Sequence, residues 1–472
     1  IFTWMKPFQR PSNYWLLLVG GVSFIVTLGM LQFGLFMQEE GDVAETVVSA
    51  CNAVGFLGIF MFSGVILDSY DLALSIGKNA AFSGMFIGVF MFASLFGSVV
   101  MWALLQRYPS LWRRHAQTVL VATLLLYICG LALYCTVTLL VRSGEVHAII
   151  PATLIASRIV SGVGYGLLAM FVDVFFIYLT DSAARPRQMA RVQFARMMGI
   201  GLGPLAAAGL WAMLGKNLAA VPSLALGLSM GMLVHVYLSF PSLQDFPSFA
   251  TTVFRQASLD STITVDGPSA GVPSMSDSAR KKRQIVIGVC LVMGMLRGYI
   301  IAGLEAALAM ILEVDYEWKP QDIGLCIGVI FLCCIPLRVL YDTLGNRLPA
   351  TTWMRYMSWF SVAGALIACW RFADVRAVIL AAVIIFPTVF LADGLSRGIM
   401  YQHLLPDGEL FADASYAGIY TQFMTNGIGR FFGPWFARLF LDTGGTSLYF
   451  KIQVGLVFSF TLLAELFLIS TP

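Results

Sequence analysis

Charged side chains lie inside apolar stretches of this sequence, at positions where an ion is expensive to bury. They are Arg158, Asp173, Arg297, Glu305, Asp393 and Arg397, with Arg430 directly after a glycine-rich segment. An ionised group at the centre of a bilayer costs about 2.5 to 3.5 kcal/mol on insertion scales, so each needs a partner or a task. Guanidinium groups pair well with carboxylates and phosphates. The predicted chemistry is therefore binding of a small anionic solute.

Arg158 and Arg297 are the principal candidates for binding that solute. Each lies about eleven or twelve residues into its helix, about 16 to 18 Å along the axis and near the bilayer midplane. We expect both to face a central cavity. Arg430 reaches either the same cavity or the lipid headgroups, and it completes the predicted substrate-binding set.

The acidic candidates are Asp173, Glu305 and Asp393. A carboxyl group at membrane depth can serve proton coupling, because desolvation favours its neutral form. Asp393 and Arg397 are four residues apart on one helical face, which favours an internal ion pair for these two. For Glu305 pairing and coupling are both open.

Motifs of the common catalytic sites are absent from the sequence. It contains no GxxxxGK[ST], no HExxH and no GxSxG, and its eight cysteines fall inside apolar stretches without metal-ligand spacing. We therefore expect no enzyme, no ATP-driven pump, and no cofactor or metal. The 29 basic and 26 acidic residues nearly balance, which gives no indication of a nucleic-acid partner.

The composition indicates that lipid is the main solvent of the chain. Hydrophobic residues make up 58% of its 472 residues and charged residues 12%, and the mean hydropathy is +0.82. Soluble domains have about a quarter charged residues. We predict a multi-pass integral membrane protein surrounded by the lipid bilayer. The sequence opens at Ile1 without a starting Met, so we expect any targeting segment to have been lost or to lie outside it, and the compartment stays open.

Thirteen segments are apolar and long enough to span a bilayer, seven before a polar break and six after it. The predicted organisation is an extra N-terminal helix and loop (1–46), a six-helix bundle (47–240), a cytoplasmic linker (241–284) and a second six-helix bundle (285–472). The linker ends in the basic run Arg280 to Arg283, and its side of the membrane collects twice as many Lys and Arg residues as the other side. This bias predicts that the linker is cytoplasmic.

One motif recurs in the fifth helix of each predicted bundle. Gly199, Gly203 and Pro204 spell GxxxGP, and so do Gly429, Gly433 and Pro434. Glycines four apart allow close helix packing, and proline permits a bend. A single copy is typical of any membrane bundle, whereas two copies in matching positions favour an internal duplication.

With these motifs the sequence resembles the major facilitator superfamily over nearly the whole chain past residue 47. Arg158, Gly162, Gly164 and Gly166 are similar to the family's fourth-helix pattern RxxxGxGxG, and the first GxxxGP to its fifth-helix motif. The resemblance implies an all-α fold of two pseudo-symmetric six-helix bundles. It also implies a gate, matched by Asp342, Gly345 and Arg347 (DxxGxR) and by a degenerate copy with Arg107, Arg113 and Arg114 but no acidic residue.

Under this resemblance the hydrophobic segment 14–37 is an addition to the family's fold. If it spans the membrane, it creates a cytoplasmic loop with Glu39, Glu40, Asp42 and Glu45 but no Lys or Arg, against the usual charge bias. A surface-lying or hairpin segment is the alternative. The same segment is the candidate contact for a partner subunit.

The stretch from Glu305 through Trp318 to Gly324 resembles the vacuolar and lysosomal branch that includes SPX-domain phosphate transporters, although this sequence has no SPX domain. The favoured function is a secondary transporter of a small, anionic solute that works by alternating access with proton coupling or exchange. The alternatives are a transporter-derived accessory subunit of a membrane complex and, less favoured, a channel.

Overall fold

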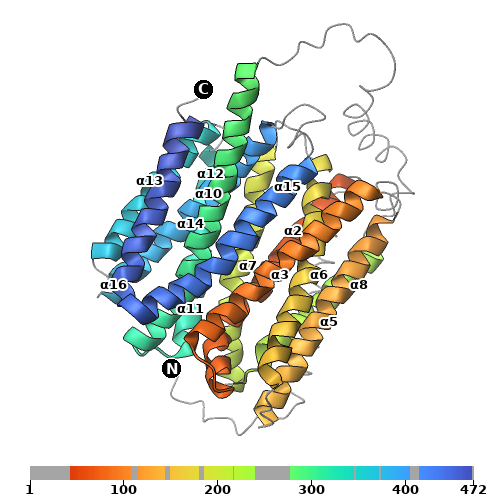
Figure 1. The fold of residues 1–472 in the computed structure, drawn as a ribbon, viewed down its shortest axis with the longest axis vertical. Helices are drawn as coiled ribbons and strands as arrows, with labels where there is room; N and C mark the ends of the chain where they lie inside the picture. Colours follow the sequence, from red (N-terminus) through yellow and green to blue (C-terminus); the bar gives the residue numbers. More distant parts are fainter. Residues whose placement is uncertain are drawn as a thin grey trace.

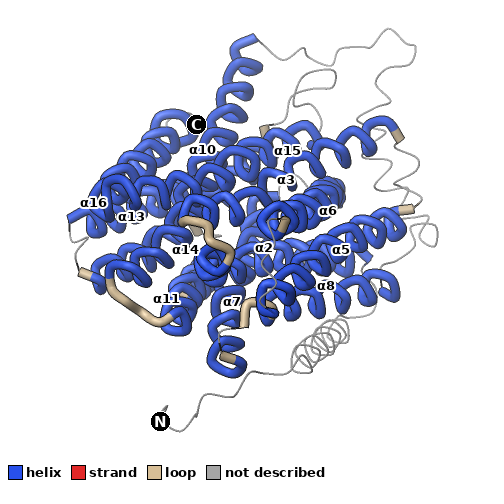
Figure 2. Tube along the Cα trace, turned by 60° about the horizontal axis from the view of Figure 1, so that its bottom comes forward, coloured by secondary structure: helices blue, strands red, loops and turns tan. Residues whose placement is uncertain are grey.

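The computed structural model describes most of the predicted bundles as helices joined by short turns. The described residues are 43–108, 115–143, 149–179, 185–215, 217–239, 277–344, 347–370, 374–403 and 414–469, and they include no strand (Figure 2). The predicted segment 14–37, residues 241–276 of the linker, and Arg113, Arg114 and Gly345 lie outside the described residues.

The first half of the chain contributes six long helices. They are α2 (Val43–Ser75), α3 (Ala80–Arg107), α5 (Ala116–Ser143), α6 (Ile150–Leu179), α7 (Arg185–Leu214) and α8 (Ala220–Ser239). Most of them lie to the right in Figure 1.

The second half is similar but more interrupted. Its elements are α10 (Asp277–Met310), the π-helix η2 (Ile311–Asp315), α11 (Pro320–Leu332), α12 (Cys334–Leu344), α13 (Ala350–Trp370), α14 (Val375–Gln402), α15 (Ala414–Gln422), the π-helix η3 (Phe423–Arg430), α16 (Phe431–Leu463) and the π-helix η4 (Ala464–Ile469). Proline interrupts the hydrogen-bond ladder, and η3 ends four residues before Pro434.

Ten helical stretches of the described residues are long and apolar enough to cross a membrane. One of them, Gly418–Leu466, contains a break at Gly445, whose φ of 66° and ψ of −174° interrupt α16. Glycine adopts this backbone conformation without steric cost. The protein is therefore a multi-pass integral membrane protein.

Local sequence signals account for several helix starts. Asn79 accepts a hydrogen bond from the N–H of Phe82 (3.1 Å) at the start of α3, and Asp374 accepts one from Arg376 (3.0 Å) before α14. Pro320 begins α11, where a missing N–H costs nothing. The predicted linker boundary differs from the structure, because α10 begins at Asp277 rather than at residue 285. The basic run is therefore helical, and α10 projects beyond the bundles at that end (Figure 1).

The two GxxxGP motifs pack the fifth helix of each half against its first helix. A Cβ added at Gly199 of α7 would lie 2.6 Å from the carbonyl oxygen of Phe56 in α2. A Cβ added at Gly429 would lie 2.5 Å from the carbonyl oxygen of Met295 in α10. Gly203 and Gly433, one turn further on, meet the same two helices. The same packing in both halves is what an internal duplication produces.

The glycines of RxxxGxGxG place α6 between two neighbours. Gly162 and Gly166 face α3, and an added Cβ at Gly166 would lie 1.8 Å from the carbonyl oxygen of Ser94. Gly164 faces Tyr127 of α5. Small residues thus bring three helix backbones together, as expected where lipid offers no hydrophobic drive for association.

The two halves meet mainly where α7 packs against α11 and α14, and where α3 packs against α16 and η3. Helix α7 packs against α11, where Gly201 faces Phe331 and Gly324 faces Pro204. Helix α3 packs against α16 and η3, where Gly84 faces Pro434. Charged residues at this interface are enclosed by protein and not by lipid.

We expect Gly199→Val and Gly429→Val to destabilise the protein, because each new side chain would meet a backbone carbonyl that cannot move freely. The expected loss is about 1 to 3 kcal/mol or more, read as a lower unfolding temperature in detergent. Gly288→Val is the matched control, since no atom lies within 4 Å of an added Cβ there. Equal unfolding temperatures for all three variants would contradict this packing.

Candidate solute site between the two bundles

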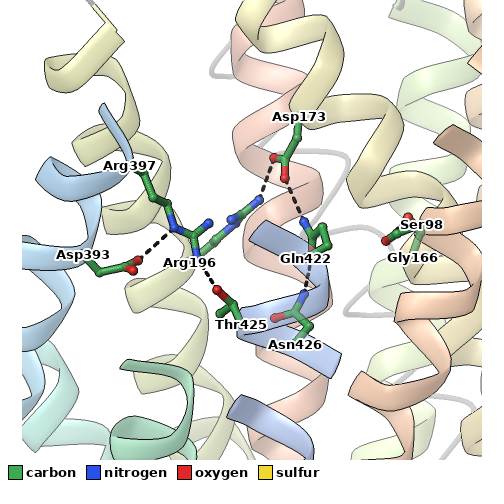
Figure 3. Close-up of polar contacts among 9 residues, drawn as sticks. All are labelled: Ser98, Gly166, Asp173, Arg196, Asp393, Arg397, Gln422, Thr425 and Asn426. Carbon is green, nitrogen blue, oxygen red and sulfur yellow. Dashed lines mark hydrogen bonds and ion pairs between the residues drawn. The ribbon is translucent and has the colours of Figure 1, made fainter. Parts of the chain in front are cut away.

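A buried ion triad joins α10 and α14. Asp393 Oδ2 lies 3.2 Å from Nε of Arg297 and 3.0 Å from Nε of Arg397. The exposed fractions of the three side chains are 0%, 3% and 8%, respectively. Asp393 and Arg397 share one face of α14 because they are four residues apart, and Arg297 approaches from α10. One carboxylate therefore neutralises two guanidinium groups at depth; Figure 3 shows its contact with Arg397.

The triad reaches η3 through Arg397. Its Nη2 donates to Thr425 Oγ1 at 3.2 Å, and the ring of Phe390 lies 5.5 Å from the guanidinium carbon of Arg297. Hydrogen bonds and an aromatic face both stabilise a cation that has lost its water.

A second polar chain crosses from the first half to the second. Arg196 Nη2 donates to Asp173 Oδ1 at 2.8 Å, and Gln422 Nε2 donates to Asp173 Oδ2 at 2.9 Å. Asn426 in turn donates to the Gln422 side chain. Asp173 and Arg196 belong to α6 and α7, whereas Gln422 ends α15, so this carboxylate ties the bundles together (Figure 3).

Arg430 and Glu305 lie deeper along the same interface. Both are buried, and Arg430 is close enough to Glu305, Arg196 and Arg397 for their charges to interact. Glu305 interacts in the same way with Arg430 and Arg297. Oε1 of Glu305, and Nε and Nη1 of Arg430, have no hydrogen-bond partner among the described residues. We call Asp173, Arg196, Arg297, Glu305, Asp393, Arg397 and Arg430 the central charged cluster.

A narrow apolar crevice adjoins this cluster and has Glu305 in its wall. Its lining comes from both halves: Ser63, Ile66, Leu67, Pro204, Glu305, Ile327 and Phe331. The space among these side chains does not admit a water molecule. The interface is thus closed around a buried carboxyl group.

Arg158 does not join Arg297. It is buried among aromatic rings of its own half, with its guanidinium carbon 4.6 Å from the ring of Phe90 and 5.4 Å from that of Phe86. Arg430 lies 5.7 Å from the ring of Phe62, and the rings of Phe62 and Phe90 are 6.3 Å apart. Two phenylalanines therefore stand between Arg158 and the central charged cluster.

The predicted gate is only partly described. Arg107 is exposed at the end of α3, 6.0 Å from the Tyr108 ring, and Arg347 is exposed after α12. Asp342 lies within α12. On this linker side, where α8 ends and α10 begins, one contact between the bundles is the hydrogen bond from Gln422 to Asp173, which the sequence marked as an acid for coupling or pairing.

A further contact closes the opposite side. Arg438 of α16 is buried and donates to the Ser83 hydroxyl of α3 and, at 3.3 Å, to Ser69 Oγ of α2. Sequence reasoning missed Arg438 and Arg196, although both are charges within apolar segments and depth alone marks them. It also missed Gln422, for which the sequence offers no comparable signal.

Comparison with family models and with curated proteins finds no match to the sequence. Among solved structures the chain is similar to the human organic anion transporter MFSD10 (TETRAN), with a TM-score of 0.59 and 16% identity over 90% of this chain and 100% of that chain. It is similar to the xylose transporter XylE from E. coli, with a TM-score of 0.61 and 14% identity over 89% and 97%. The chain has the major facilitator fold.

A POT family transporter in complex with a thioalcohol conjugated peptide is a third such structure, with a TM-score of 0.59 and 12% identity over 89% of this chain and 95% of that chain. The three proteins are an organic anion transporter, a xylose transporter and a transporter in complex with a conjugated peptide, so they differ in the molecules they are described with. At these identities the likeness establishes the major facilitator fold, as the sequence predicted, and leaves the solute to be argued from this chain's own residues.

We expect Asp393→Asn to lower the free energy of unfolding by about 3 to 5 kcal/mol, because two buried guanidinium groups lose their counter-ion. Thermal unfolding in detergent measures the effect. Glu465→Gln is the matched control. Glu465 pairs with Arg355 at 2.9 Å, but the side chains are 24% and 47% exposed, so the loss should stay below about 1 kcal/mol. Similar losses at both positions would contradict the triad's role.

We expect Asp173→Ala to weaken closure on the linker side, since it removes the acceptor shared by Arg196 and Gln422. Met170 and Gly418 meet across the interface there. Met170→Cys with Gly418→Cys, in a background without native cysteines, should be cross-linked by a short bifunctional thiol reagent, and Asp173→Ala should lower the yield severalfold. The exposed Asp277→Ala is the control. An unchanged cross-linking yield in Asp173→Ala would show that Asp173 does not keep the two bundles together on the linker side.

Proposed function

We propose that this protein is a secondary transporter that carries a small monoanionic solute together with a proton by alternating access. The charge of the central cluster carries the proposal. Four arginines face three carboxylates, so one positive charge is left when all are ionised. A buried cation without a partner is costly, and an anion with oxygen acceptors is its natural complement.

Arg430 is the proposed anchor of the solute. Within the part of the chain that the structure describes, two of its nitrogens, Nε and Nη1, have no hydrogen-bond partner although the side chain is buried. A carboxylate, sulfonate or phosphate oxygen can accept from both. Arg297 is the proposed second anchor, because it adjoins the same charges from α10.

Glu305 is the proposed proton carrier. Its charge interacts with Arg430 and Arg297, the groups that would bind the solute. When an anion takes these guanidinium groups, the Glu305 carboxylate loses its counter-ions and is left in an apolar crevice. It then binds a proton, which neutralises it. One anion and one proton together carry no net charge, so their joint passage moves no net charge across the membrane.

The two interface ties fit alternating access. Asp173 with Gln422 closes the linker side, and Arg438 with Ser69 and Ser83 closes the other. Neither tie uses the residues proposed to bind the solute. We propose that the two bundles rock about the central cluster, breaking one tie at a time. The sequence-predicted boundaries, 47–240 and 285–472, give the approximate moving units.

We expect Arg430→Ala to abolish uptake of anions by reconstituted vesicles, and Glu305→Gln to retain exchange but lose acceleration by a proton gradient. The wild-type protein should take up anion faster as the outside is acidified, because protonation of Glu305 accompanies binding. Uptake of a labelled, permanently ionised sulfonate measures both effects.

Arg376→Ala is the control, since Arg376 is an exposed arginine far from the cluster. Undiminished uptake in Arg430→Ala would remove the proposed anchor. Uptake in Glu305→Gln that follows pH as in the wild type would remove the proposed proton carrier.

A further inference from the structure

The apolar half of the solute site is as informative as its charges. Phe62, Phe90 and Tyr165 stand on the first-half side of the central charged cluster, and we call them the aromatic wall. The rings of Phe90 and Tyr165 are stacked, with centroids 5.5 Å apart and an interplanar angle of 21°. Phe62 continues the wall, 6.3 Å from Phe90.

Two observations place this wall at the solute site. The guanidinium carbon of Arg430, the proposed anchor, lies 5.7 Å from the ring of Phe62. The hydroxyl group of Tyr165 lies within electrostatic range of the charged groups of Arg196, Arg430, Asp173 and Arg397. All three wall residues are buried.

The local sequence makes room for the wall. An added Cβ at Gly58 of α2 would lie 1.9 Å from Cε2 of Tyr165, so only glycine allows the ring to lie against that helix. The crevice beside Glu305 adds apolar side chains, among them Ile66, Leu67 and Phe331. Apart from Ser63 and Glu305, the crevice lining is apolar.

A site of this kind distinguishes organic from inorganic anions. Phosphate or sulfate is hydrated on every side, and an aromatic surface replaces none of that water. An anion with a flat aromatic body loses water only at its charged end, where arginine replaces it. Its ring gains stacking and apolar contact along the wall.

We propose that the solute is an aromatic organic monoanion whose charged group binds Arg430 and whose ring lies along Phe62, Phe90 and Tyr165. This inference rests on the proposed transport function and names the solute class of the same site.

The test measures the uptake of three labelled sulfonates by vesicles that contain the full chain, with inorganic phosphate as a competitor. The sulfonates are benzenesulfonate, cyclohexanesulfonate and methanesulfonate, which stay ionised at all relevant pH values and do not leak as neutral acids. Benzenesulfonate should be taken up about tenfold faster than methanesulfonate at equal low concentration, and severalfold faster than cyclohexanesulfonate. Phosphate should not compete.

Substitutions of phenylalanine by leucine, which keep the side chain apolar, then test which rings cause the preference for benzenesulfonate. Phe62→Leu and Phe90→Leu should lower the ratio of benzenesulfonate to cyclohexanesulfonate uptake by about threefold to tenfold, the range expected for loss of one aromatic contact. Phe86→Leu is the matched control, because the Phe86 ring lies against Arg158 and Tyr134, so this substitution should leave the ratio unchanged.

The wild-type panel decides the proposal even if a variant fails to fold. Equal uptake of the three sulfonates, or a preference for phosphate, overturns the aromatic solute while transport of anions stands. No uptake of any anion, with no shift in unfolding temperature on adding benzenesulfonate, overturns both the solute class and the proposed function. If the double variant Phe62→Leu, Phe90→Leu keeps the wild-type ratio of benzenesulfonate to cyclohexanesulfonate uptake, the aromatic wall does not bind the ring of the solute and the proposal is wrong.

Discussion

The structure depends on keeping guanidinium groups ionised in a region without water. Asp393 does most of this, because one carboxylate serves Arg297 and Arg397 from two helices. A buried pair of this kind adds little net stability over an apolar core, yet breaking it leaves an uncompensated charge. The triad therefore fixes the relative position of α10 and α14 more than it strengthens the fold.

Backbone packing makes that arrangement possible. Carbonyl groups that an added Cβ would strike, such as those of Phe56 and Met295, show that the helices are held at distances only glycine permits. Because lipid supplies no apolar drive for association, such contacts and the buried charges carry the assembly together. The site is polar at its centre and tightly packed around it.

The sequence predicted the fold far better than the site. Length, apolarity and the repeated GxxxGP sufficed for a helical membrane protein of duplicated bundles, because those features depend on each helix separately. Depth along a helix marked Arg158 and Arg297 alike. It did not indicate their direction, and the aromatic rings of Phe62 and Phe90 separate Arg158 from the central cluster.

Two residues of the interface, one neutral and one charged, were also not predicted from the sequence. Gln422 is an ordinary amide in the sequence and becomes important only because α15 approaches α6 in space. Arg196 lay within a predicted span and was overlooked, although its charge alone identified it. Pairings between segments far apart in the chain cannot be read from one sequence without information on which helices meet.

The π-helical segment η3 links two parts of the interface mechanically. It begins directly after Gln422 and ends at Arg430. A π-turn holds more residues than an α-turn, and each residue of an α-helix turns the chain by about 100°. Any tightening of this segment to α geometry would swing Gln422 and Arg430 relative to each other about the helix axis. Gln422, which closes the linker side, and Arg430, which lies beside Glu305, thus flank one π-helical segment. A change of η3 to α geometry would change the orientation of both side chains together.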